Sequence, residues 1–464
     1  MIVLGLALVS VAVVRPGPVE EWLGGRPPSP PPATWTGPAP SPVLVGVDRD
    51  APAPTAAGVA AVLDPLVADR GLGARVLASV VDVASGEVLY ARDPDGSATP
   101  ASTAKLVTAV TVLAARGPAY RLVTRAVAGD NPGEVVLVGG GDPTLAAGAT
   151  GSYPGAARLD DLAAKVKQAL GATAPSKVVV DTSLFSGPLL GPGWDSDIVS
   201  GGYGSVTSAL MIDGARVDPK DVTDPAKRHQ RPELAAGQAF AKALGLPASA
   251  VTVSRAPAPP ANGASPAPGA GPTPGTELGR VESPPVSRLV EIMLEKSDNV
   301  LAEALARQVA LAKGKPASYE GAAAAMDEVL AELGLPAAEN GLVDGSGLSR
   351  ANRVTPSLLT DLLTVAARAD RPDLHPVFSG MPVAGYSGTL ADRFRTAAPT
   401  RPGAGVVRAK TGTLSGVNAL SGIVITQEGR LLAFAVLADK TPGGDGPEAA
   451  LDRVATALAT CGCR

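Results

Sequence analysis

The chain has 464 residues, of which 45% are hydrophobic, 18% charged and 3% aromatic. Its 40 basic and 44 acidic residues give a formal charge of −4 at pH 7, a near balance that argues against nucleic-acid binding and against a polybasic membrane-binding surface. The length predicts two or three folding units.

The N-terminal segment Met1–Val14 is an unbroken run of apolar and small residues. It has the length of a signal-peptide core and is shorter than the roughly 20 residues that a membrane-spanning helix needs. Residues 15–55 are rich in proline, which favours an extended spacer. We therefore expect residues 1–14 to be an export signal or a membrane anchor; a buried strand or helix is the alternative. An exported or anchored chain acts outside the cytoplasm.

Folded sequence is expected from about residue 56. A helix is predicted up to Asp69, strands at Arg75–Val83 and Glu87–Arg92, and a helix from Pro100 to about Ala115.

Residues 119–284 have a different pattern and predict an inserted domain. Short strands, such as Glu134–Val138 and Lys177–Val180, alternate with Gly-rich turns and with a helix at Leu159–Leu170. Residues 256–279 are dominated by Pro, Ala and Gly and predict a disordered loop.

Helical periodicity resumes at Val286 and continues, with one interruption, to Lys313. Three strands are predicted next, at Val406–Ala409, Ala419–Ile425 and Leu431–Leu437. A helix at Pro447–Ala459 is predicted to end the chain. The last two strands predict a hairpin. The fold class is therefore α+β, an antiparallel sheet flanked by helices, formed by residues 56–118 and 285–464 and interrupted by the insert.

The first chemical motif is Ser102-Thr-Ala-Lys105, at a predicted helix start. Residues three apart lie on the same helix face, so the hydroxyl and the amine become neighbours. A lysine that is kept neutral can act as the base that makes a serine nucleophilic. A surface Ser and Lys with no chemical role is the alternative.

The second motif, Ser297-Asp298-Asn299, lies between two helical stretches. By itself it predicts a helix N-cap, because all three residue types favour that position. In a catalytic role Ser297 would relay a proton between Lys105 and the leaving amine, and Asn299 would hydrogen-bond the substrate backbone.

The third motif, Lys410-Thr411-Gly412-Thr413, follows a predicted strand. A strand edge can bind an extended peptide, and Gly412 would let that peptide approach closely. Lys410 and the two threonine hydroxyls would bind a terminal carboxylate. An ordinary strand end with a charged tip is the alternative.

Other chemistries find less support. A Ser-His-Asp hydrolase is disfavoured, because the only histidines, His229 and His375, lie in polar or Pro-flanked contexts without a Gly-x-Ser-x-Gly motif. Cys461 and Cys463 supply two ligands where a zinc site needs four, so we expect no metal, no cofactor and no structural role for them.

The three motifs in this order resemble those of penicillin-binding proteins and class A β-lactamases. In the long interval between Ser102 and Ser297 the chain resembles the D-alanyl-D-alanine carboxypeptidases of the penicillin-binding protein 4 type, which carry an inserted domain at that point. These enzymes are low-molecular-mass class C penicillin-binding proteins. Further matching stretches are PASTAK (100–105), GGGDPTL (139–145), PGW (192–194), KSDN (296–299), DGSGLSR (344–350), GYSGTL (385–390) and AKTGTLSGV (409–417). Between Asp213 and Val286 the chain is shorter than fuller family members.

The resemblance implies a serine D,D-carboxypeptidase that acts on peptidoglycan stem peptides and is inhibited covalently by penicillins. It implies Ser102 as the acylated nucleophile and Lys105 as its base, with Ser297 and Asn299 completing the site, Lys410 and Thr411 binding the carboxylate, and the N–H groups of Ser102 and Thr413 forming an oxyanion hole. It also implies a pocket for a diamino-acid side chain, made by Asp197, Tyr203, Arg350 and Ser415.

Three functions stay open at this point. The leading one is the D,D-carboxypeptidase, with D,D-endopeptidase activity on cross-links left open. A β-lactamase is the second, and the long insert counts against it. The third is a non-catalytic peptidoglycan-binding or β-lactam-sensing protein, which would not need the pair Ser102 and Lys105.

Overall fold

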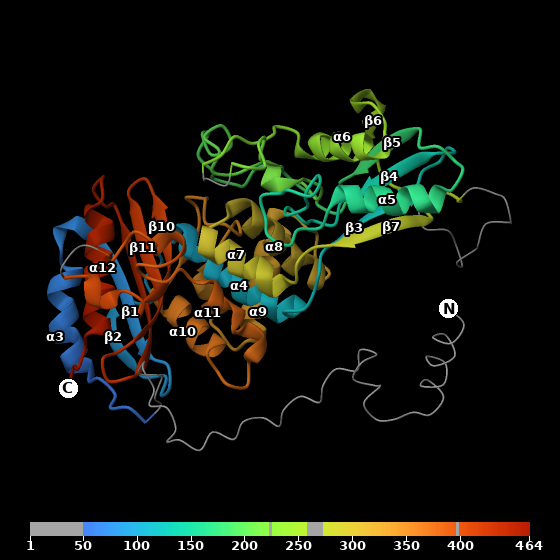
Figure 1. Cartoon of the computed structure of the whole chain (residues 1–464). Helices are drawn as coiled ribbons and strands as arrows, with labels where there is room; N and C mark the ends of the chain where they lie inside the picture. Colours follow the sequence, from blue (N-terminus) through green and yellow to red (C-terminus); the bar gives the residue numbers. More distant parts are fainter. Residues whose placement is uncertain (1–49, 222–224, 258–271, 396–398) are drawn as a thin grey trace, which may run out of the picture. The chain divides into compact units, whose positions relative to one another are not determined.

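Two five-stranded β-sheets and the helices packed on them account for most of the chain that the computed structural model describes, residues 50–221, 225–257, 272–395 and 399–464 (Figure 1). The predicted leader, most of the Pro-rich spacer and most of the predicted disordered loop lie outside these residues. No helix of the described ranges is both long and apolar enough to span a bilayer.

The first sheet is antiparallel throughout and joins strands from both ends of the chain. Its strands are, in spatial order, β10 (Arg408–Leu414), β11 (Val417–Ile425), β12 (Leu431–Asp439), β1 (Arg75–Asp82) and β2 (Val88–Arg92). Two helices, α3 (Ala56–Val67) and α12 (Gly446–Ala459), cover one face of this sheet (Figure 1). Because side chains alternate along a strand, Val76 and Ala78 face these two helices while Leu77 faces the opposite layer.

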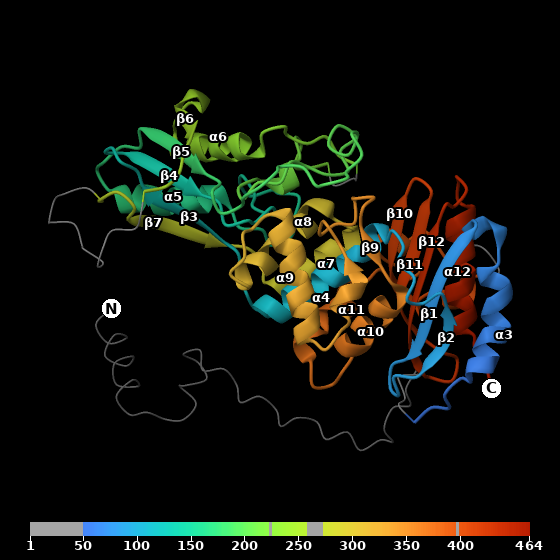
Figure 2. The ribbon, with the colours of Figure 1, turned by 180° about the vertical axis from the view of Figure 1, so that it is seen from behind.

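The opposite layer is helical and carries much of the core. It contains α4 (Lys105–Arg116), α7 (Val286–Lys296), α8 (Asn299–Ala312), α9 (Tyr319–Glu332), α10 (Pro356–Ala366) and α11 (Pro376–Gly380), seen from behind in Figure 2. Helix α4 is buried on all sides from its first residue, Lys105, to Leu113. A helix that is enclosed in this way holds its first turn in a fixed place.

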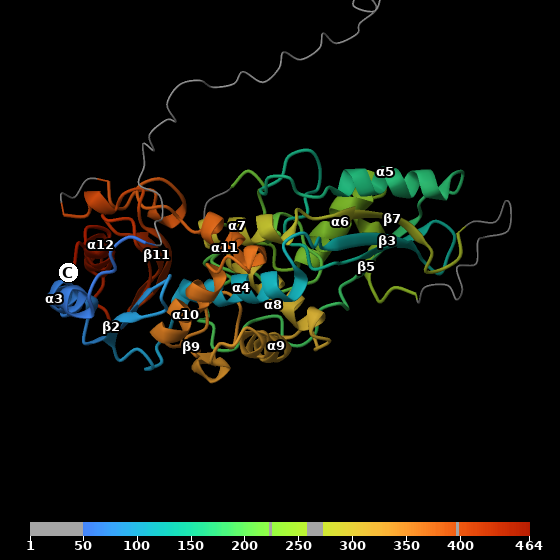
Figure 3. The same cartoon turned by 90° about the horizontal axis from the view of Figure 1, so that it is seen from below.

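The second sheet is built from the chain between α4 and α7. Its strands are, in spatial order, β6 (Val251–Val253), β5 (Lys177–Asp181), β4 (Glu134–Val138), β3 (Val123–Ala128) and β7 (Glu277–Glu282), with α5 (Leu159–Leu170) and α6 (Pro232–Leu244) on one face (Figure 3). The chain enters this segment after α4 and leaves it before α7, and these two ends are paired. Leu122 and Ser283 are joined by two hydrogen bonds of 2.9 Å. We infer that residues 119–284 are a domain inserted into the core.

Most of the predicted elements are confirmed, and α5 and β4 have the predicted bounds. Three predictions need correction. The strand predicted at Val406–Ala409 is β10, which begins at Arg408 and runs through the Lys-Thr-Gly motif because it pairs with β11 over its whole length. The helix predicted from Pro100 begins with a 3₁₀ turn, η2 (Ala101–Ala104). The loop predicted to end at residue 279 ends earlier, because Glu277 already pairs with β3.

The prediction of no structural role for the two cysteines is wrong. Cys461 and Cys463 are joined by a disulfide, and Cys461 is buried against the first sheet's helices. The backbone N–H of Thr55, which caps α3, donates to the Cys463 carbonyl at 2.7 Å. The C-terminal tail is therefore hydrogen-bonded to the residue that caps α3.

Candidate active site

The candidate nucleophile, Ser102, lies in the 3₁₀ turn that leads into α4 and is only half-buried. The preceding Ala101 has a φ of 47°, a left-handed conformation that is uncommon for a residue with a side chain. The loop 344–350 packs against this turn, since a Cβ at Gly347 would lie 1.9 Å from the Ala101 carbonyl oxygen. Surrounding structure thus fixes a strained backbone next to the hydroxyl, as is common at functional sites.

Lys105 is fully buried and meets Ser102 as the three-residue spacing predicted. Its Nζ lies 2.9 Å from Ser102 Oγ, 2.6 Å from Asn299 Oδ1 and 2.6 Å from the Ser346 carbonyl oxygen. A neutral amine has two N–H donors and one lone pair. The amide and carbonyl oxygens can only accept, so they take both N–H groups and leave the lone pair for the Ser102 hydroxyl. This arrangement suits a base that removes the serine proton.

The Ser-Asp-Asn triplet forms the sharp junction between α7 and α8. Ser297 ends α7 in the left-handed region, with a φ of 57°, and Asp298 caps α8 by accepting from Leu301 N at 2.9 Å. Both the cap predicted from sequence and the approach to Lys105 are therefore present.

The triplet also differs from the sequence-based expectation in one respect. The residue in contact with Lys105 is Asn299, which was expected to bind substrate backbone, and its Nδ2 donates to the Tyr203 carbonyl at 2.8 Å. The Ser297 hydroxyl makes no hydrogen bond within the described part of the chain. The proton-relay role of Ser297 stays a prediction.

The Lys-Thr-Gly-Thr motif lies on β10, the edge strand of the first sheet, directly beside the nucleophile turn. A Cβ at Gly412 would lie 2.5 Å from the Pro100 carbonyl oxygen, so only glycine allows the strand to approach this closely. Thr411 Oγ1 is 2.8 Å from the hydroxyl of Thr389, in the GYSGTL stretch. Thr413 Oγ1 is 3.4 Å from Glu448 Oε1, a long hydrogen bond.

Lys410 is fully buried, and its Nζ donates to the Thr411 carbonyl at 2.8 Å. Burial, followed by the positive charge of nearby Lys105, holds the pKa of Lys410 well below its ordinary value. Two ammonium groups in one site repel each other, so the charge of either lysine disfavours the charged form of the other. A bound carboxylate would stabilise the charged form of Lys410.

Sequence reasoning missed a buried carboxylate, Glu303, behind the loop 344–350. It accepts from the backbone N–H groups of Ser346 at 2.9 Å and Gly345 at 3.1 Å, and it pairs with Arg307 at 3.3 Å. Burial, and then the charge of Asp344, raise the pKa of Glu303. Glu303 therefore holds the backbone N–H of Ser346, the residue whose carbonyl oxygen accepts from Lys105. Its position five residues into α8, on a buried face, gave no signal in the sequence.

Of the four residues implied for a side-chain pocket, Arg350 and Ser415 are in contact. Arg350 donates to the Ser415 carbonyl at 3.1 Å and pairs at 2.8 Å with the carboxylate of Asp195, which is outside the implied set. Asp197 and Tyr203 are exposed, and both lie next to Gly201. The sequence could not distinguish the two aspartates, which are two residues apart in an irregular segment.

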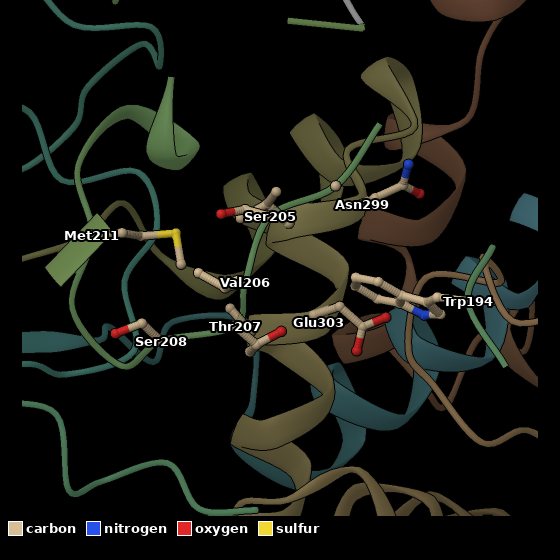
Figure 4. A pocket seen from close by; sticks show the side chains of 11 residues that line it. Trp194, Ser205, Val206, Thr207, Ser208, Met211, Asn299 and Glu303 are labelled. Atoms are coloured by element: carbon tan, nitrogen blue, oxygen red, sulfur yellow. The ribbon is translucent and has the colours of Figure 1, made fainter. Parts of the chain in front are cut away.

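A narrow pocket lies behind Asn299, between α8 and the segment 204–208 (Figure 4). Its walls include Trp194 and Glu303. The volume of about 10 Å³ holds at most a single water molecule, so the pocket is not a substrate site. The buried Ser205 hydroxyl in its wall has no hydrogen-bond partner among the described residues, and a water molecule there would supply one.

Comparison with protein-family models identifies a family that matches most of the chain. Residues 59–243 and 228–459 match the D-Ala-D-Ala carboxypeptidase 3 (S13) family. Within the described ranges, no group of three or more His, Cys, Asp or Glu side chains could hold a metal ion.

Curated relatives match over most of their length. A carboxypeptidase of Mycobacterium tuberculosis is 40% identical over 473 residues, covering 100% of this chain and 97% of the relative. Carboxypeptidase DacB of Mycolicibacterium smegmatis is 38% identical, covering 100% and 96%. The D-alanyl-D-alanine carboxypeptidase of an Actinomadura species is 31% identical, covering 86% and 84%.

Among solved structures, penicillin-binding protein 4 of Haemophilus influenzae superposes with a TM-score of 0.67 and 23% identity, covering 85% of this chain and 97% of that one. At this identity the likeness concerns the fold. It agrees with the predicted α+β core of the D,D-peptidase type.

Proposed function

The chain belongs to the D-Ala-D-Ala carboxypeptidase 3 (S13) family, and from this premise we propose that Ser102 and Lys105 carry out its D,D-carboxypeptidase reaction on peptidoglycan stem peptides. The enzyme is a serine-type D-Ala-D-Ala carboxypeptidase. The observation that carries the assignment of residues is the contact of Lys105 Nζ with Ser102 Oγ at 2.9 Å, with both other acceptors already in place.

In the acylation step, Ser102 Oγ attacks the carbonyl carbon of the penultimate D-alanine and its proton passes to the Lys105 amine. The oxyanion that forms would accept from the N–H groups of Ser102 and Thr413, which the close approach of β10 to the nucleophile turn supports. The C–N bond then breaks and the leaving amine takes the proton from Lys105, directly or through Ser297. Terminal D-alanine departs and an ester remains on Ser102.

Deacylation uses water. A water molecule attacks the ester carbonyl, the C–O bond to Ser102 breaks, and the hydroxyl recovers a proton while the shortened peptide leaves with a free carboxylate. Penicillins would open on Ser102 in the same way and leave an acyl group that hydrolyses slowly. D,D-endopeptidase action on cross-links uses the same steps with a larger leaving amine.

The substrate's terminal carboxylate is the proposed ligand of Lys410 and Thr411. Because burial and Lys105 disfavour the charged form of Lys410, an incoming carboxylate would stabilise the Lys410 ammonium. A charged Lys410 in turn favours the amine form of Lys105. Substrate binding would thus prepare the base.

The side-chain pocket is proposed to hold the zwitterionic end of a residue such as meso-diaminopimelate, against Asp197, Tyr203, Arg350 and Ser415. Since Arg350 already pairs with Asp195, two matched variants separate the aspartates. If Asp197 binds the ammonium group, Asp197→Asn lowers kcat/KM for a diaminopimelate peptide about tenfold and spares a peptide without that end. Asp195→Asn removes the partner of Arg350 but leaves the Asp197 carboxylate, so it should retain the preference for a peptide that carries the ammonium group. Equal effects of Asp197→Asn on both peptides would contradict the pocket.

The substrate of this reaction lies outside the bacterial cytoplasmic membrane, so the enzyme is proposed to act there. The apolar segment 1–14 is the candidate signal or anchor. Comparison of the N-terminal mass of the mature protein with the printed sequence distinguishes cleavage from retention.

The proposal is tested by incubating the full chain with a fluorescent penicillin and with a pentapeptide that ends in D-Ala-D-Ala. We expect covalent label, a mass adduct on the peptide that contains Ser102, D-alanine release and no label on Ser102→Ala. Label that persists on Ser102→Ala would refute the nucleophile. Drug turnover without D-alanine release would indicate a β-lactamase instead, and binding of wall fragments with neither activity would indicate a sensor.

A further inference from the structure

Asp298, the middle residue of the Ser-Asp-Asn triplet, is held by a side chain from the inserted segment. It is 3% exposed, and its carboxylate accepts from Leu301 N at 2.9 Å and from the Tyr153 hydroxyl at 2.6 Å. Tyr153 precedes it by 145 residues and is itself buried. The contact therefore joins the insert to the helix end that carries Asn299.

Two buried arginines of the insert compensate the charge of this carboxylate. Arg216 Nη1 donates to the Tyr153 hydroxyl at 3.0 Å, and its guanidinium lies 5.4 Å from the Tyr153 ring centre. Burial by itself raises the pKa of Asp298. The positive charges of Arg216 and Arg228, together with the hydrogen bonds to the carboxylate, lower it by more, so the pKa lies below its ordinary value. Asp298 is thus a buried carboxylate that stays ionised because the insert supplies opposite charge.

Arg228 also fixes the backbone that orients Asn299. Its Nε donates to the Gly202 carbonyl at 3.1 Å and its Nη1 to the Gly214 carbonyl at 2.6 Å. The carbonyl of the next residue, Tyr203, accepts from Asn299 Nδ2 at 2.8 Å. The side-chain amide of Asn299 carries its nitrogen and its oxygen on opposite sides of the carbon. Because the nitrogen donates to the Tyr203 carbonyl, Oδ1 is directed to Lys105.

We propose that Tyr153, Arg216 and Arg228 are positioning residues for acylation of Ser102, which hold Asp298 and the Tyr203 carbonyl so that Asn299 presents its oxygen to Lys105. The inference rests on the proposed function and extends it. It assigns the insert a part in the chemistry of every acyl donor, including a small β-lactam that is too short to reach the proposed side-chain pocket.

Gly214 offers a substitution that disturbs this cluster alone. Its φ is 61°, and a Cβ there would lie 2.4 Å from the Tyr153 hydroxyl oxygen, 2.9 Å from Arg216 Nη1 and 3.2 Å from Arg228 Nη1. Gly245 is the matched control, with a left-handed backbone (φ 90°, ψ 19°) in the same insert and no atom within 4 Å of a Cβ. Alanine at either position has a similar left-handed backbone cost, so only the difference between the two variants reports on the cluster.

The experiment measures saturable acylation of the full chain by a small fluorescent penicillin. We expect Gly214→Ala, Tyr153→Phe and Arg228→Lys to lower the acylation rate constant about tenfold or more, while the apparent dissociation constant and the final labelled fraction stay within about twofold. Gly245→Ala and Tyr90→Phe should acylate at the wild-type rate; Tyr90→Phe removes a hydroxyl that donates to Asp64 at 2.9 Å, far from the site.

A purely structural role would lower the melting temperature or the labelled fraction and leave the rate constant of the folded protein unchanged. That result, or unchanged kinetics, would overturn the inference while the proposed function stands. A wild-type chain that takes up no label would overturn both. If Gly214→Ala does not fold, the rate constant of Tyr153→Phe decides, because that change removes one oxygen and adds no bulk.

Discussion

Replacing Asn299 by aspartate changes the electrostatics at Lys105 with almost no change of shape. Asn299 Oδ1 lies 2.6 Å from Lys105 Nζ. At an effective dielectric constant of about 20, a full negative charge at this distance favours the ammonium over the amine by about 6 kcal/mol. Asn299 is half-buried, and solvent screening together with the cost of desolvating the new charge reduces this figure. We take about 3 kcal/mol, which lowers the population of neutral amine about a hundredfold.

The assay is the acylation rate constant with a fluorescent penicillin between pH 7 and 9.5. For Asn299→Asp we expect a loss of about a hundredfold or more at pH 7, and a partial recovery of about tenfold for each pH unit, because the amine form returns as protons become scarce. Asn299→Ala removes the acceptor without adding charge, so its smaller loss should not depend on pH in this way.

An Asn299→Asp enzyme that acylates within tenfold of the wild-type rate at pH 7 would refute this reasoning. So would a deficit that stays constant as the pH rises, since it would mean that the neutral amine of Lys105 is not the base.

Three further substitutions test other parts of the structure. Burial raises the pKa of Asp142 to about 6, above the value of an aspartate in the unfolded chain. Between about pH 4 and 6 the folded chain therefore binds more protons than the unfolded chain, and the free energy of unfolding falls as the pH rises. Asp142→Asn should therefore add roughly 2–3 kcal/mol to the unfolding free energy at pH 7 and little at pH 3.5; equal gains in denaturant titrations at both pH values would contradict this. Glu303→Gln keeps the volume but replaces one acceptor oxygen, so the backbone N–H groups of Gly345 and Ser346 are held less firmly and acylation slows about tenfold at an unchanged labelled fraction. A normal acylation rate would exclude this role of Glu303. Gly412→Ala would place a Cβ 2.5 Å from the Pro100 carbonyl oxygen, so the unfolding free energy should fall by roughly 1–3 kcal/mol and kcat/KM should fall at least tenfold. Wild-type values for D-alanine release and thermal unfolding would show that β10 has room for the added methyl group.

Several features could be predicted because they depend on residues close together in the chain. The three-residue step from Ser102 to Lys105 gives their contact on any helical turn, and Asp298 caps α8 through the N–H of Leu301. The hairpin of β11 and β12 follows from alternating apolar residues around a Gly-containing turn.

The family resemblance supplied what spacing alone could not, namely that three motifs far apart in sequence form one site. It did not supply the contact of Asn299 with Lys105, which joins residues 194 positions apart. It also did not supply the ion pair of Arg350 with Asp195. Both points depend on which atom faces which after folding.

The sequence by itself determined the local elements, the order of the motifs and, through them, the class of enzyme, because helices, caps and hairpins are decided by neighbouring residues. Only the tertiary structure decided that Glu303 supports the carbonyl beside Lys105 and that Tyr153 of the insert reaches Asp298. Such buried polar groups have no periodic signal, since their partners come from distant segments and are fixed only when the core packs.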